Sequence, residues 1–223
     1  MKKQLKGMAA LALIGVVGLT SPAWAVYQPK DGEKQKFDIT LNDGKVGVYH
    51  VDFSVPQDGA ILAKTSFALK IAAMGRTMAD IRAVGNELVW QNRFVEMQGV
   101  GQNAEEKYDL TMKTAKDGTM NITQSTEQIT APAGTVPFSL WNKGTLDATH
   151  IYDPVQKKST QINPKKIRTE SIRVLGESKK CVKYKLKNPE GNSMYLWYGE
   201  GDDQLCRVMI KVKKFKMVYT PVE

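Results

Sequence analysis

Histidine and cysteine are scarce in this chain, which has only two of each among its 223 residues. A metal site needs several histidine, cysteine or carboxylate ligands that converge. The glycine patterns of phosphate and dinucleotide sites are missing, and so is the Gly-x-Ser-x-Gly motif of hydrolases. We therefore expect no cofactor, no metal site and no catalytic residue that the sequence alone identifies.

Long apolar runs are also missing beyond the first 25 residues. Lys2, Lys3 and Lys6 precede a short apolar run, and Ala23 and Ala25 follow as small residues. This order is typical of a secretory signal peptide cleaved after Ala25. A membrane anchor is the alternative, but a run of about 12 residues is shorter than the roughly 20 that span a bilayer. We expect a signal peptide at 1–25, a single β domain at 26–223 and a periplasmic location.

Period-two alternation dominates the remaining chain and predicts strand after strand. Strands are expected near 37–41, 46–53, 61–71, 78–84, 87–95, 106–115, 119–128, 148–153, 158–163, 166–175, 179–187, 193–199 and 205–219. Turn dipeptides stand at 43–44, 85–86 and 117–118. A short helix within 66–84 is the alternative for that stretch. The pattern predicts an all-β fold, a strongly curved antiparallel sheet or open barrel of about ten or more strands.

The segment 131–137 is rich in proline and glycine, and we expect a long connection or a lid there rather than a central strand. A histidine and an acidic turn elsewhere in the chain are candidate metal ligands, but their surroundings favour structural roles. His50 shares a strand face with Val46 and Val48, which is typical of a structural histidine. The acidic turn at 200–203 lacks the ligand spacing of a calcium loop and is expected to be solvated.

Three segments resemble an uncharacterised family of exported bacterial β proteins, known as domains of unknown function. They are the hairpin sequence at 43–51, Ser139-Leu140-Trp141-Asn142, and Leu196-Trp197-Tyr198. The chain departs from the family in having Gly199 and Gly201 and two cysteines. The resemblance implies a curved antiparallel sheet similar to the open barrels of periplasmic lipid and lipoprotein carriers, and it implies no catalytic residue.

The two cysteines, Cys181 and Cys206, leave the disulfide question open. An oxidising periplasm favours a bridge. Strand alternation argues against it, because Cys181 is in register with polar lysines and Cys206 with apolar Val208 and Ile210. In a simple meander another strand also separates the two, and a disulfide needs Cα atoms within about 7 Å. A bulge or a strand end would bring the two cysteines within bonding distance.

Positive charge is concentrated in the C-terminal part of the chain. Residues 156–216 hold 16 basic and 6 acidic residues, whereas residues 26–155 hold 13 basic and 16 acidic residues. Solvated lysines that discourage edge pairing are one interpretation. The other is contact with an anionic membrane surface or an acidic protein partner through Lys183, Lys185, Lys187, Arg207, Lys211 and Lys213. We expect no nucleic-acid partner, since no aromatic array interleaves these lysines.

Apolar residues alternate with the lysines, and the apolar residues of several strands are expected to line one concavity. Ordinary core packing is the alternative interpretation. The candidate ligand-binding residues are Phe67, Leu69, Trp141, Tyr184, Leu196, Tyr198 and Ile210, with Trp141 and 131–137 at the mouth. A barrel of ten or more strands is difficult to fill with side chains alone. The leading hypothesis is a non-enzymatic periplasmic carrier of a lipid-like or other apolar ligand. The alternatives are an envelope assembly factor that acts through sheet edges and a carboxylate-based hydrolase.

Overall fold

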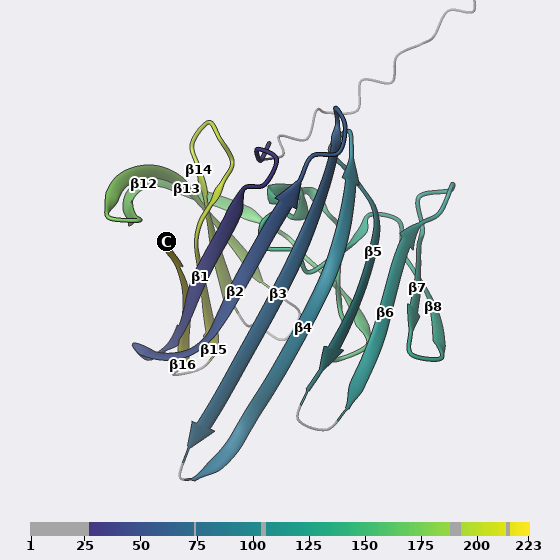
Figure 1. Ribbon diagram of the computed structural model, residues 1–223, viewed down its shortest axis with the longest axis horizontal. Coiled ribbons are helices and arrows are strands. Elements are labelled where there is room, and N and C mark those ends of the chain that lie inside the picture. Colours follow the sequence, from purple (N-terminus) through teal and green to yellow (C-terminus); the bar gives the residue numbers. More distant parts are fainter. Residues whose placement is uncertain (1–26, 74, 104–105, 188–192, 213–214) are drawn as a thin grey trace, which may run out of the picture.

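A computed structural model shows an almost entirely β protein (Figure 1) and describes residues 27–73, 75–103, 106–187, 193–212 and 215–223. The predicted signal peptide and Lys213 lie outside these residues. Thirteen strands form one sheet: β1 (Lys34–Leu41), β2 (Gly44–Ser54), β3 (Ala60–Ala73), β4 (Arg76–Trp90), β5 (Arg93–Gln102), β6 (Lys107–Thr114), β7 (Met120–Gln124), β8 (Glu127–Ala131), β12 (Lys165–Val174), β13 (Glu177–Lys187), β14 (Ser193–Gly199), β15 (Leu205–Val212) and β16 (Phe215–Val222).

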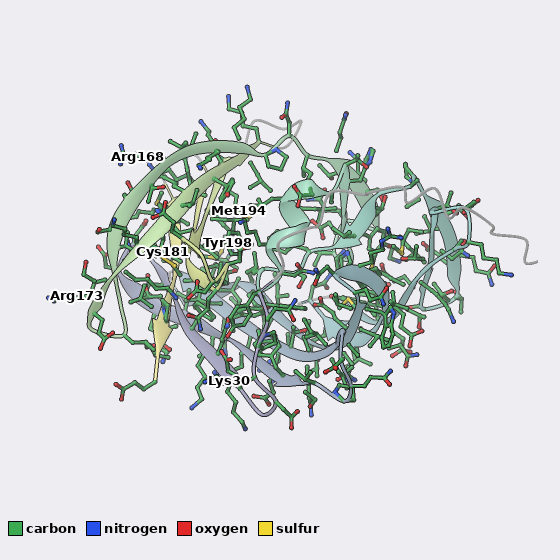
Figure 2. All side chains as sticks on the ribbon, turned by 90° about the horizontal axis from the view of Figure 1, so that it is seen from above. Lys30, Arg168, Arg173, Cys181, Met194 and Tyr198 are labelled. Carbon is green, nitrogen blue, oxygen red and sulfur yellow. A yellow bond between two sulfur atoms is a disulfide. The ribbon has the colours of Figure 1, made fainter. Side chains whose placement is uncertain are left out.

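The large sheet is antiparallel throughout and remains open. Its order is β12-β13-β14-β15-β16-β1-β2-β3-β4-β5-β6-β7-β8, so that the last strand pairs with the first. β12 and β8 are the two edges, and they do not pair with each other. Seen from above, the sheet curves around the rest of the chain (Figure 2). The predicted all-β class with a curved, open-barrel sheet is confirmed.

The segment between the two edges of the large sheet, residues 132–164, is here called the inner segment. It contains β9 (Thr135–Pro137), η1 (Lys143–Asp147), β10 (His150–Asp153) and β11 (Lys158–Gln161), and its strands form a second, three-stranded sheet. Leu140, Trp141, Leu146 and Ile151 pack in the main core with the large sheet. The inner segment therefore fills much of the curve.

The proline- and glycine-rich stretch is part of this inner segment rather than a lid. β9 pairs in parallel with β10 and forms an edge of the small sheet. A proline has no N–H to donate, and an edge strand tolerates that loss because one of its sides is unpaired. The prediction of a connection holds only for the middle, 132–134, because Ala131 ends β8 and residues 135–137 form β9.

Several turns differ from the predictions. β4 runs straight through 85–86, where a turn was predicted, and the chain reverses instead at Gln91 and Asn92, whose φ angles are 47° and 66°. The predicted strand 119–128 is two strands, with Ser125 at φ 53° between them. The stretch 66–84 is β strand on both sides of Gly75, so the helical alternative is wrong. Residues other than glycine adopted these positive φ angles, which a turn search based on glycine overlooks.

Two glycines allow adjacent strands of the large sheet to approach closely. A Cβ atom on Gly47 would lie 2.2 Å from the Ala68 carbonyl oxygen, and one on Gly99 would lie 2.7 Å from that of Val84. Glycine within a strand is typical of a bend or a close backbone approach. The curvature of β2 to β5 therefore depends on residues that lack a side chain.

Cys181 in β13 and Cys206 in β15 form a disulfide across β14, with their Cα atoms 6.7 Å apart. The pairing of β14 with β15 contains a bulge. Because of this bulge Leu205 and Val208 both face the core, and Cys206 packs beside Cys181 and Trp197 in a separate outer cluster. Strict alternation along β15 was the wrong assumption, since one extra residue reverses the faces.

Candidate binding cavity and cationic face

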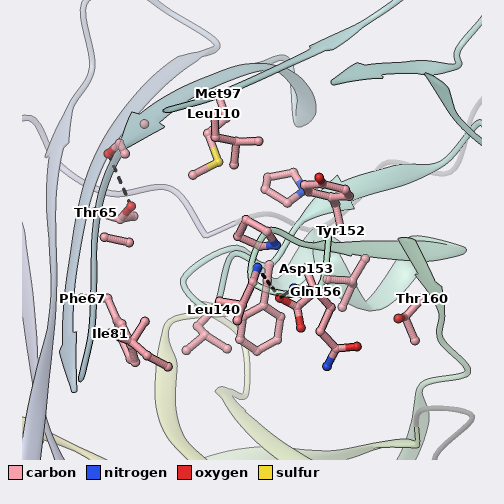
Figure 3. Close-up of a pocket in the computed structure, with 18 of the residues that line it drawn as sticks. Thr65, Phe67, Ile81, Met97, Leu110, Leu140, Tyr152, Asp153, Gln156 and Thr160 are labelled. Carbon is pink, nitrogen blue, oxygen red and sulfur yellow. Dashed lines mark hydrogen bonds between the residues drawn. The ribbon is translucent and has the colours of Figure 1, made fainter. Parts of the chain in front are cut away.

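A cavity of about 460 Å³ lies between the large sheet and the inner segment. Its wall is mainly apolar and comes from β2 to β6, β10 and the strands β13 to β16. Figure 3 shows Phe67 and Ile81 on one side and the inner segment on the other. The apolar and aromatic lining includes Tyr49, Phe67, Ile81, Met97, Tyr108, Leu110, Met112, Phe138, Leu140, Ile151, Tyr152, Met194, Ile210 and Tyr219. The main core and a second core cluster around β6 and β7 both contribute to this wall.

Polar side chains line the cavity from both the large sheet and the inner segment. Asp153, Gln156 and Thr160 lie on the inner-segment side of the cavity (Figure 3). The Asp153 carboxylate accepts hydrogen bonds from the backbone amides of Val155, at 2.8 Å, and Gln156, at 3.2 Å. These bonds fix the turn between β10 and β11, so Asp153 has a structural role there.

Glu87 is the buried charged residue on the sheet side of the cavity. It lies on the inner face of β4 and is 2% exposed. Trp141 Nε1 donates a hydrogen bond of 3.1 Å to Glu87 Oε2. Trp141 is itself fully buried and packs edge-on against Phe53, with ring centroids 5.2 Å apart. The inner segment therefore holds the carboxyl group in place from one side.

Burial raises the pKa of Glu87 from 4.5 to about 7, because desolvation penalises the charged form. The Ser139 hydroxyl and the Trp141 indole partly oppose this shift. Ser139 Oγ is buried and has no hydrogen-bond partner. The side-chain hydrogen bond to Glu87 therefore comes from Trp141. The pKa of the buried Tyr49 hydroxyl is raised by burial first and by Glu87 second.

Most of the predicted ligand-binding residues lie in the core rather than in the cavity wall. Phe67 and Ile210 line the cavity. Five others do not line it: Leu69, Trp141, Tyr184, Leu196 and Tyr198. Four of them lie on the inner face of the large sheet, against which the inner segment packs, and Trp141 is part of the inner segment itself. The Tyr198 hydroxyl, for example, donates a hydrogen bond of 2.9 Å to the Leu140 carbonyl.

Glu87 was missed because sequence reasoning selected only apolar positions for the concavity. A signal was present, since Ile81, Ala83, Gly85, Glu87 and Val89 alternate along one face and only Glu87 is charged. A single acid in such a series is expected to be buried and hydrogen-bonded. Its partner, Trp141, is 54 residues away in the chain and cannot be deduced from the pattern.

The outer side of β13 to β15 carries a group of lysines and aromatic rings, here called the cationic face. It comprises Lys183, Lys185, Lys211, Tyr195 and Trp197. Lys183 Nζ lies 4.6 Å from the centre of the Trp197 ring and 5.0 Å from that of Tyr195. Lys185 and Lys211 lie over the Tyr195 ring at 5.6 and 5.9 Å. Two aromatic rings therefore lie among these lysines, where the sequence was expected to place no aromatic array.

The other predicted cationic residues are placed differently. Lys187 lines the cavity, and the Nε atom of Arg207 is buried without a hydrogen bond. The side chain of Lys183 is only 15% exposed and lies 3.8 Å from Glu170. Packing beside aromatic rings removes the exposure that alternation suggests for Lys183, whereas Lys187 at the end of β13 remains exposed. Lys185 and Lys211 are the more accessible charges of the cationic face.

Metal binding finds no support in the described residues, where no group of three or more His, Cys, Asp or Glu side chains could hold an ion. The acidic turn at 200–203 forms ion pairs instead of being merely solvated. Asp202 lies 2.7 Å from Lys179. Asp203 pairs with Lys143 of η1, and both of these side chains are largely buried. The turn thereby ties β14 and β15 to the inner segment.

The fold and cavity define an open, barrel-like β protein with an apolar interior space. Within the described part of the chain, no helix is long and apolar enough to cross a membrane. The sequence model of the protein family DUF6134, a domain of unknown function, matches residues 37–222. The chain therefore belongs to the DUF6134 family.

Two solved structures are similar to it. The β-barrel-like protein of domain of unknown function DUF1849 from Brucella abortus is 9% identical, with a TM-score of 0.60 over 85% of this chain and 95% of that one. The hypothetical lipoprotein YmcC from Escherichia coli (K12) is 8% identical, with a TM-score of 0.33 over 88% and 90%. No curated protein matches the chain. The first similarity supports the barrel-like fold alone.

Proposed function

We propose that the protein is a non-enzymatic carrier that holds a lipid-like or other apolar ligand between its large sheet and its inner segment. The observation that carries this proposal is the cavity of about 460 Å³ with its mainly apolar wall. Small-molecule sites are typically clefts of roughly 300–1,000 Å³ with apolar linings and few polar groups. A cavity of this kind remains although the inner segment packs against both core clusters.

The proposal includes an exported, single-domain protein. A signal peptide at 1–25, cleaved after Ala25, would deliver residues 26–223 to the periplasm. The support for this step is the order of charged, apolar and small residues at the N-terminus. The cationic face would then approach an anionic membrane surface.

A carboxylate-based hydrolase has weaker support. Glu87 has the raised pKa expected of a general acid. Glycoside hydrolysis, however, needs a second carboxyl group placed across the reacting bond. The only other carboxylate among the described lining residues is Asp153, which is committed to two backbone amides of its own turn.

An assembly factor that acts through sheet edges is the second candidate, favoured by one observation. β12 is an edge of the large sheet, and most of its side chains are exposed. Unpaired backbone groups on an edge can bind an added strand. This candidate predicts a protein partner and no dependence on the cavity, so the same experiment separates the two functions.

The test compares a cavity-filling variant with a matched one. Ala83 lines the cavity from β4, so Ala83→Phe should occupy ligand space. Ala79→Phe adds the same ring on the same strand face, outside the cavity lining. Native mass spectrometry of protein purified from its own envelope should detect bound lipid with wild type and Ala79→Phe, and at least about tenfold less with Ala83→Phe. Equal lipid loading of both variants, or no lipid on the wild type, would contradict the carrier function.

A further inference from the structure

The cavity wall contains one buried charged group on its sheet side. The charged side chains among the described lining residues are Glu87, Asp153 and Lys187. Lys187 is exposed, and Asp153 is bound to its own turn. Glu87 alone is buried among apolar neighbours, where a polar group is stable only if it is hydrogen-bonded.

The hydrogen-bonding capacity of Glu87 is only partly used. A carboxylate has about four acceptor positions, and Trp141 Nε1 fills one of them on Oε2. Ser139 and the Tyr49 hydroxyl are its other polar neighbours. No lysine or arginine of the described residues forms an ion pair with Glu87. The Glu87 carboxyl group, with unused hydrogen-bond acceptor positions, therefore faces a mainly apolar cavity.

We propose that the cavity binds an amphiphile whose head group donates hydrogen bonds, an ammonium or hydroxyl group, and that the Glu87 carboxyl group accepts them. This inference rests on the proposed carrier function and names the ligand class of the same cavity. The apolar lining would surround the chain of the ligand, and Glu87 would fix its head. A ligand with an ionised carboxylate head would meet a like charge in a low-dielectric site and bind poorly.

Three probes with the same apolar chain test the head group: dodecylamine, dodecanol and dodecanoate. Each is titrated by displacement of an apolar fluorescent dye from wild type, at about pH 6 and about pH 8. A charge-assisted hydrogen bond is worth about 1.5–3 kcal/mol, which is roughly 10- to 100-fold in affinity. We expect dodecylamine to bind tightest and dodecanoate weakest at the higher pH, because Glu87 is then ionised. Between the two pH values the affinity for the amine should rise and that for the carboxylate should fall.

Glu87→Gln removes the charge and retains an acceptor for Trp141, so the fold should persist. In this variant the preference for the amine and its pH dependence should vanish, while Glu177→Gln, an exposed change on β13, should leave both intact. Equal affinities of wild type and Glu87→Gln for all three probes would overturn the anchor and leave the carrier function standing. Absence of binding of every probe to wild type would overturn both. If Glu87→Gln does not fold, the wild-type pH profile tests the anchor without it, because probe affinities that do not change with pH would also overturn the anchor.

Discussion

At the residue scale, Glu87 couples the cavity to the stability of the protein. An acid whose pKa is raised in the folded state keeps its proton more readily there than in the unfolded chain. Stability therefore falls as pH rises, between the unfolded pKa near 4.5 and the folded pKa of about 7. This direction is opposite to that of a salt-bridged carboxylate such as Glu170, whose pKa is lowered by its Trp197 hydrogen bond first and its basic neighbours second.

The pH dependence can be measured directly. Over this window the wild type should lose about 3 kcal/mol of unfolding free energy, since one pKa unit corresponds to 1.36 kcal/mol. Tyr49 faces the same carboxyl group and stays neutral, because its own pKa is raised. Urea unfolding of wild type and Glu87→Gln between about pH 4.5 and about pH 8 should show the loss only in the wild type. Parallel pH profiles for the two proteins would show that Glu87 is not the buried titrating group.

At the scale of elements, alternation predicted the strands well and their partners poorly. The apolar face of β13 to β15 was predicted correctly, because buried and exposed positions follow a period of two. The inner segment was not foreseen as a filler of the curve, since its contacts join residues far apart in sequence, such as Tyr198 and Leu140. Such contacts leave no local periodicity, which explains why four predicted cavity residues pack in the core with the inner segment and the fifth, Trp141, is part of that segment.

The disulfide is the second case in which an element departs from its pattern. It joins residues 25 positions apart, and closing a loop of that length restricts the unfolded chain. Replacing both residues, Cys181→Ser with Cys206→Ser, should lower the unfolding free energy by about 3 kcal/mol. Chemical denaturation checks the loss, and treatment of wild type with a reductant should reproduce it. Probe binding in the cavity should persist under native conditions, because the bridge packs with Trp197 on the outer face. Loss of probe binding by the folded double variant would show that the bridge shapes the cavity.

At the scale of the whole molecule, charge and apolar surface are separated by the sheet itself. The inner face borders the cavity, while the outer face of β13 to β15 bears the cationic face. The separation follows from alternation and was predictable, but the stacking of lysines on Tyr195 and Trp197 was not. Aromatic rings beneath the lysine ammonium groups restrict their positions, so the charges are presented in a more fixed arrangement.

The separation predicts how the protein meets a membrane. Each lysine near an anionic surface contributes about 1 kcal/mol, so Lys185→Gln with Lys211→Gln should weaken binding to phosphatidylglycerol-containing vesicles roughly 30-fold. Lys64→Gln with Lys70→Gln removes the same charge from exposed positions of β3 and serves as the control. Vesicle sedimentation at low and moderate salt should show the larger loss for the first pair, and added salt should reduce the difference. Equal losses from both pairs would mean that net charge alone attracts the protein, and the cationic face would then have no special part in bringing the cavity to the lipid.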